Sequence, residues 1–89
     1  MSATVTEVEI WNRAIRPESG NFSTAAAREL LELQLAEADQ QRSRELSVKA
    51  NTGTLNADET QELDQYLNVG RALEFLKAKA RLSLRDAAA

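Results

Sequence analysis

The stretch that most constrains this 89-residue chain lies at residues 52–59, where a helix-stop signal is followed at once by a helix-start signal. Gly53 suits the left-handed backbone conformation that closes many helices, because glycine has no Cβ to clash. Asn56 can accept a hydrogen bond from a backbone N–H of the next helix, and Glu59 can reach back to the N–H of Asn56. Together these signals predict a helical hairpin around Gly53–Asn56.

The N-terminal part of the chain, residues 1–22, is predicted to be an arm or a short helix. Its apolar residues recur at spacings of three and four, which is typical of an amphipathic helix. Thr4 or Thr6 can cap such a helix. Pro17 is expected to end it, because a proline disfavours the helical conformation of the residue before it.

Residues 23–51 are predicted to form either one kinked helix or two helices. Ser23 or Thr24 can cap the start, and alanine and leucine then dominate. No glycine or proline marks a break near Ala36, yet the apolar phase changes there, and a break or kink is therefore favoured. In the second half of this segment Leu46 and Ala50 are the expected core residues.

A long helix is predicted over residues 56–84, with residues 85–89 as a frayed tail. Its broad apolar stripe is typical of a helix that contacts more than one neighbour. Gly70 interrupts that stripe at a cost of about 1 kcal/mol relative to alanine, so a close approach or a mild kink is expected there. The chain as a whole, residues 1–89, is predicted to be a single all-α domain, a small bundle of three to four helices.

The composition favours a non-enzymatic protein. The sequence has neither histidine nor cysteine, which removes the commonest general base, the commonest metal ligand and the thiolate nucleophile. The glycines are too far apart for a phosphate-binding loop. We therefore predict no catalytic residue, no cofactor and no metal. The sequence has no secretory signal and no apolar run long enough for a membrane span, so a cytoplasmic protein without membrane contact is expected.

The broad stripe of the long helix is the predicted surface for a protein partner or for a second copy of the chain. Arg81 belongs to this set, although it can instead pair with Glu45 or Asp39 of the preceding helix. The residues predicted to contact a partner are Tyr66, Val69, Leu73, Phe75, Leu76 and Arg81.

Several short motifs of the chain resemble a group of small bacterial proteins. They read Glu45-Leu46, Lys49-Ala50, Gly53-Thr54-Leu55-Asn56, Glu59, Val69-Gly70, Lys79-Ala80-Arg81 and Ser83-Leu84. Asn56 stands where the group often has threonine, and Ala36 where a capping serine is common. Members of the group are encoded beside HNH-type nucleases, so the resemblance implies an antitoxin-like inhibitor or partner of such a nuclease.

The charges are unevenly distributed and give two alternatives to an apolar surface. Residues 1–70 hold six Lys/Arg against twelve Asp/Glu, whereas residues 71–85 hold five Lys/Arg against Glu74 alone. An acidic face made of Asp58, Glu59, Glu62 and Asp64 could bind a basic nuclease. The basic end could bind nucleic acid, but the acidic start of the long helix disfavours that function.

Overall fold

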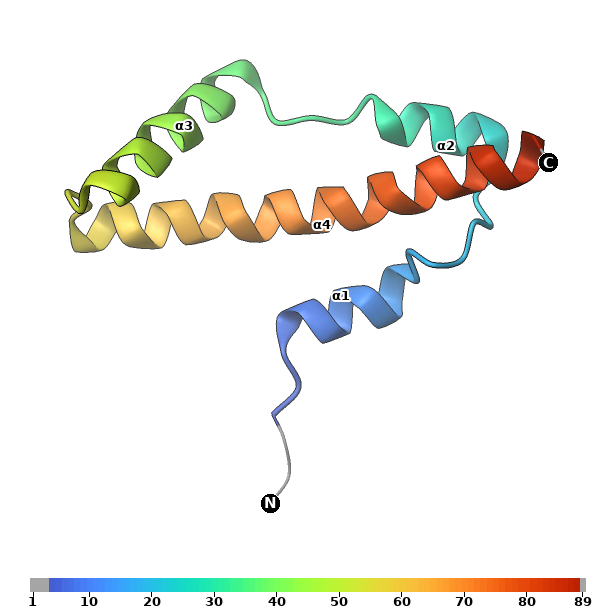
Figure 1. Ribbon diagram of the computed structural model, residues 1–89, viewed down its shortest axis with the longest axis horizontal. Helices are drawn as coiled ribbons and strands as arrows, with labels where there is room; N and C mark the ends of the chain where they lie inside the picture. Colours follow the sequence, from blue (N-terminus) through green and yellow to red (C-terminus); the bar gives the residue numbers. More distant parts are fainter. Residues whose placement is uncertain (1–3, 89) are drawn as a thin grey trace. The chain divides into compact units, whose positions relative to one another are not determined.

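The computed structural model describes residues 4–88, which form four α-helices and no strand (Figure 1). The helices are α1 (Glu7–Ile15), α2 (Thr24–Leu31), α3 (Glu37–Thr52) and α4 (Ala57–Ala88). The predicted all-α class is confirmed, as a small helical bundle with a long C-terminal helix. Among these residues no helix is both long and apolar enough to cross a membrane.

Helix α1 has clear signals at both ends. The Thr6 hydroxyl oxygen accepts a hydrogen bond of 3.2 Å from the N–H of Glu9, which caps the N-terminus. Arg16, the residue before Pro17, closes the helix in the left-handed conformation with φ of 56°, and its N–H donates to the Asn12 carbonyl. Arg16 is the only non-glycine residue with positive φ in the described part of the chain.

Residues 23–51, predicted to form one kinked helix or two helices, form two separate helices. Helix α2 begins after Ser23, whose hydroxyl accepts from the N–H of Ala26, and its C-cap is Glu32. Helix α3 begins after Ala36, whose side chain makes no capping bond. The side-chain amide of Gln40 donates to the Leu35 carbonyl at 2.8 Å, which ties the first turn of α3 to the loop before it.

Helix α4 runs four residues beyond its expected end at Leu84. The segment expected to fray is helical as far as Ala88, because alanine has the highest helix propensity; Ala89 lies outside the described residues. The expected close neighbour of Gly70 is absent, since a Cβ built there would meet no atom within 4 Å. The 32 residues of α4 span about 48 Å.

The described residues fall into two compact units. Gln34–Gly70 form the first unit, and the segments on either side of it in the sequence form the second. In the first unit Leu46 is fully buried, as predicted, but Ala50 is exposed. The reason is that Arg42, Leu46 and Lys49 share the face of α3 that meets the start of α4, and Ala50 lies at its edge.

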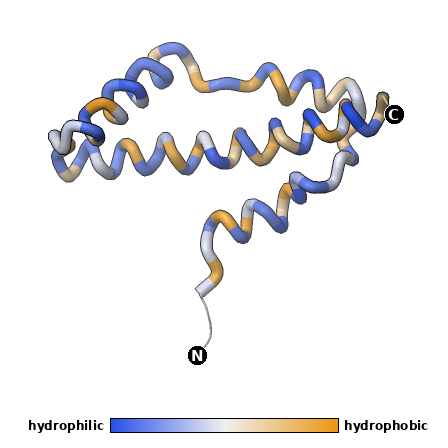
Figure 2. Tube along the Cα trace, in the orientation of Figure 1, coloured by the Kyte–Doolittle hydropathy of each residue, from blue (hydrophilic) through white to orange (hydrophobic). Residues whose placement is uncertain are grey.

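The core of the second unit is made of small and polar side chains. Its buried apolar residues are Ile15, Ala27 and Ala80, and the buried polar residues are Lys79 and Ser83. Larger apolar side chains, among them Phe22, Leu73 and Leu76, are half-buried around it, and Figure 2 shows apolar residues spread along α1 and α4. The small buried residues allow the segments to approach closely, and the polar contacts of Lys79 and Ser83 add to this packing.

Candidate functional site

Three features of the molecule compete for a functional role: a polar network at the hairpin, a buried lysine near the C-terminus of α4, and an uncovered apolar face on α1. The first belongs to the unit Gln34–Gly70 and the other two to the second unit.

The hairpin is closed by Gly53 and by a reciprocal capping box. Gly53 has φ of 70°, and its N–H and that of Thr54 donate to the last carbonyls of α3. The N–H of Glu59 donates to the Asn56 side chain at 2.8 Å, and the N–H of Asn56 donates to the Glu59 carboxylate at 3.1 Å. These bonds fix the turn and bury most of the Glu59 side chain.

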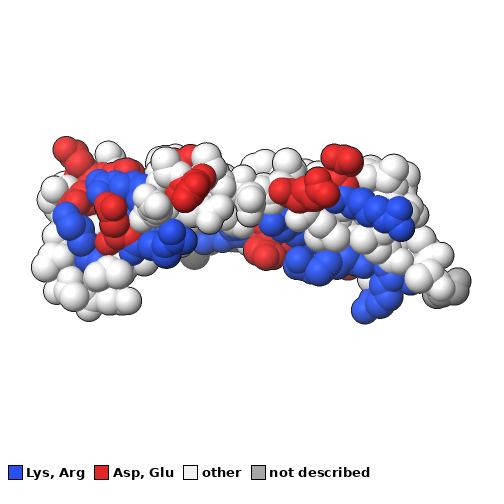
Figure 3. All heavy atoms as spheres, turned by 90° about the horizontal axis from the view of Figure 1, so that it is seen from above, with Lys and Arg blue, Asp and Glu red and all other residues white. Residues whose placement is uncertain are grey.

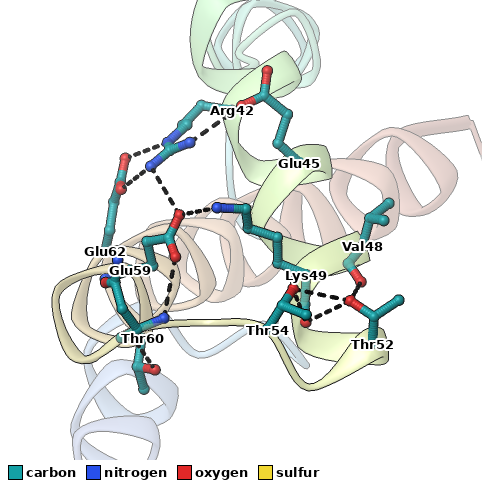
Figure 4. Close-up of polar contacts among 10 residues, drawn as sticks. Arg42, Glu45, Val48, Lys49, Thr52, Thr54, Glu59, Thr60 and Glu62 are labelled. Atoms are coloured by element: carbon teal, nitrogen blue, oxygen red, sulfur yellow. Dashed lines mark hydrogen bonds and ion pairs between the residues drawn. The ribbon is translucent and has the colours of Figure 1, made fainter.

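Two cations of α3 neutralise the first turns of α4 (Figure 4). Lys49 donates to Glu59, while Arg42 binds Glu62 through two nitrogens at 2.8 and 2.9 Å. Arg42 also lies 3.2 Å from Glu45 and 3.8 Å from Glu59. A bidentate arginine–carboxylate pair, such as that of Arg42 and Glu62, fixes the geometry of both side chains.

The network shifts the pKa values of its members in the directions expected for stable ion pairs. The hydrogen bond from Lys49 lowers the pKa of Glu59, helped by the N–H of Asn56. The hydrogen bond from Arg42 lowers the pKa of Glu62. A hydrogen bond of 2.8 Å to Asp39 raises the pKa of the Tyr66 phenol. These groups stay in one protonation state near neutral pH, as structural ion pairs do.

In the second unit Lys79 holds the C-terminal end of α1. Its side chain is only 6% exposed, and the ammonium donates to the Ile15 carbonyl at 2.7 Å. The Lys79 ammonium also lies 4.8 Å from the centroid of the Phe22 ring, close enough for a cation–π interaction. A cation at a helix C-terminus also complements the helix dipole.

Ser83, one turn further along α4, fixes the same loop. Its hydroxyl accepts from the N–H of Phe22 at 3.1 Å and donates to the Lys79 carbonyl at 2.7 Å. Gly20 also approaches α4 closely, because a Cβ there would lie 3.0 Å from the Leu82 carbonyl carbon. Lys79, Ser83 and Gly20 therefore anchor residues 15–22, a role that the sequence did not reveal.

The apolar face of α1 is open beyond this anchor. Ile15 is 8% exposed, but Trp11 and Val8, on the same face, are 36% and 38% exposed. Val5 and Ile10 are more exposed still. Sequence periodicity indicated the amphipathic character of this helix, but it could not show that the face would stay uncovered.

The residues predicted to contact a partner are not gathered into one open surface. Val69 is exposed, whereas Leu73, Phe75 and Leu76 are half-buried. Tyr66 is half-buried and bonded to Asp39. Arg81 lies 3.3 Å from Glu74 on its own helix, while Glu45 and Asp39, the carboxylates proposed for it, belong to the other unit and bind Arg42 and Tyr66.

The described residues hold no group of acidic side chains arranged to bind a metal ion. A shallow hollow of about 330 Å³ on α3 is open to solvent and is lined by Gln41, Arg44, Glu45 and Val48. All four belong to successive turns of one helix, so the hollow is a groove between surface side chains. No protein family, curated protein or solved structure matches the chain.

Proposed function

We propose that this chain is a non-enzymatic protein-interaction module that binds its partner through the exposed apolar face of α1. The observation that carries this proposal is the exposure of Val8 and Trp11, which share one face of α1. Val5, which precedes the helix, and Ile10, on another side of it, are exposed as well, and the four residues are half of the large apolar side chains exposed in the part of the chain that the structure describes. Clustered apolar exposure of this kind is characteristic of interaction surfaces.

The anchor at Lys79 explains how α1 can remain ordered with this face open. An isolated helix of nine residues is marginally stable in water. Here burial of Ile15 and the hydrogen bond from Lys79 hold its last turn. The core thus holds the last turn of α1, and the preceding one and a half turns or so are left for the proposed partner, to which Trp11 offers the largest contact area.

The two charge-based alternatives are less well supported. Two of the four carboxylates proposed for an acidic, nuclease-binding face, Glu59 and Glu62, are engaged by Lys49 and Arg42. In the basic stretch Lys79 is buried and Arg81 pairs with Glu74. Figure 3 shows acidic and basic side chains intermingled on the face it presents, without a broad field of one sign. An apolar surface remains the best-supported candidate.

Photo-crosslinking in the cells that make the protein tests the proposal. A photoreactive phenylalanine analogue at position 11 should give a covalent adduct of defined mass with a protein. The matched control places the same analogue at Val48, which is 62% exposed on α3 and outside the proposed surface. Absence of an adduct at position 11, or equal adducts at both positions, would refute the proposed surface.

A further inference from the structure

We infer that Gly70 is a hinge at which α4 bends, so that the two units of the chain can reorient relative to each other. This motion takes place at the joint between the units and does not depend on the surface of α1 proposed for a partner. The position of Gly70 in the chain and the space around it both support this role.

The chain passes between the two units twice. The first passage lies between Leu33 and Gln34, and the second lies between Gly70 and Arg71. Movement of one unit relative to the other therefore requires the backbone to bend at both passages.

The first passage lies in a loop that bends easily. Residues 33–36, between α2 and α3, have no regular secondary structure. The side chains of Leu33, Gln34 and Ala36 are exposed. An exposed loop of this kind changes its backbone angles at low cost. The second passage lies inside α4, so this helix limits the movement.

Gly70 weakens α4 at the second passage. Glycine has more backbone freedom to lose than any other residue, so a helix is less stable where it contains one. A Cβ built at Gly70 would meet no atom within 4 Å, so packing does not require a glycine at this position. What glycine does provide there is a helix that bends more easily than one with alanine.

The polar contacts of α4 on either side of Gly70 fasten each half of the helix to its own unit. Tyr66, four residues before Gly70, bonds to Asp39 of the first unit. Lys79, nine residues after it, bonds to Ile15 of the second unit. A helix held in this way at two places bends between them, and Gly70 is the weak point of that stretch.

The hinge gives the chain a range of relative orientations of its two units. Helix α1 belongs to the second unit, whereas the hairpin at Gly53 belongs to the first. A partner that contacts both units would therefore select one orientation and order the joint on binding.

Double electron–electron resonance between pairs of spin labels tests the hinge on the full chain. The sequence has no cysteine, so a labelled cysteine can be introduced at any chosen position. Val48→Cys with Arg85→Cys reports across the boundary, and Val48→Cys with Leu67→Cys reports within the first unit; all three side chains are exposed. The distance distribution of the first pair should be at least about twice as wide as that of the second.

Gly70→Ala should narrow the distribution of the Val48–Arg85 pair nearly to the width of the within-unit pair, because alanine stiffens the helix at the boundary. Val69→Ala is the matched control. It also raises helix propensity, at the neighbouring exposed position, but it keeps the glycine. This control should leave the width of the distribution unchanged.

Two results would overturn the inference. One is a Val48–Arg85 distribution that is as narrow as the Val48–Leu67 distribution when Gly70 is present. The other is a wide distribution that Gly70→Ala leaves unchanged, or that Val69→Ala narrows equally, because the movement would then not depend on Gly70. Circular dichroism of each labelled variant verifies that its helices are intact.

Discussion

Substitution of Ser83 by alanine gives the sharpest test of how the second unit is held together. The Ser83 side chain is 2% exposed, and its hydroxyl is the acceptor for the N–H of Phe22 at 3.1 Å. Alanine fills nearly the same space but removes that acceptor. The Phe22 N–H is then left without a partner in a partly buried position, while α4 itself loses only a side-chain bond to the Lys79 carbonyl.

The magnitude follows from two opposing terms. A buried donor without a partner costs about 1–3 kcal/mol, and the lower half of that range applies because the N–H of Phe22 is only partly buried. Alanine returns roughly 0.5 kcal/mol through its better helix propensity. The free energy of unfolding should therefore fall by about 1 kcal/mol, which lowers the melting temperature of a domain of this size by roughly 4–8 °C.

Ser43→Ala is the matched control. The Ser43 hydroxyl also bonds back to a carbonyl of its own helix, that of Gln40 at 3.0 Å, but no distant segment donates to it. Its replacement should leave the melting temperature unchanged or raise it slightly. Thermal unfolding followed by circular dichroism at 222 nm measures both variants. If Ser83→Ala melts within about 2 °C of the wild type, or if Ser43→Ala is equally destabilised, the anchoring role of Ser83 is refuted.

Further changes probe the close approach, the open glycine and the ion pairs. Gly20→Ala should destabilise the protein by about 1–3 kcal/mol in urea titrations, because its Cβ would lie 3.0 Å from the Leu82 backbone; no loss would contradict that packing. Gly70→Ala should stabilise it by about 0.5–1 kcal/mol, as the site is helical and open; a lower urea midpoint would show a hidden contact. Hydrogen bonds from Lys49 and Arg42 hold the pKa values of Glu59 and Glu62 in the folded chain below the ordinary glutamate value of 4.5. The unfolded chain therefore binds more protons, so stability should fall as pH drops below about 4.5; Glu59→Gln should flatten that fall, and an unchanged acid profile would argue against the ion pair.

Local signals in the sequence were enough to predict the helical class and the hairpin. The N-cap at Asn56 and the helix end at Gly53 depend only on residues within one turn of each other. Both can therefore be predicted from residues that are close in the sequence. The end of α1 before Pro17 follows in the same way. Where a boundary has no such marker, as at Ala36, the sequence left one or two helices open, and the structure has two.

The roles of Lys79 and Ser83 could not be predicted, because their partners are distant in the sequence. Lys79 meets Ile15 across 64 residues and Ser83 meets Phe22 across 61. A basic residue in a basic stretch is expected to be solvated, and nothing in the neighbouring residues shows that a helix end will cover it. Sequence reasoning also missed the partner of Arg81, which is Glu74 on the same helix; the carboxylates proposed for Arg81 belong to the other unit, a division that the spacing of residues does not reveal.

The apolar residues of α1 divide into Ile15, which the core buries, and others that it leaves exposed. Most of the fully buried residues of the second unit are small or polar, such as Ala27, Ala80 and Ser83, and larger apolar residues around them are half-buried. Trp11 and Val8, which could bury far more apolar area, lie outside that core on a helix already held at its other end. Because the anchor at Lys79 holds only the last turn, the proposed partner would bind the open turns without any rearrangement of the core. We propose that this division exists because the open turns form a binding surface.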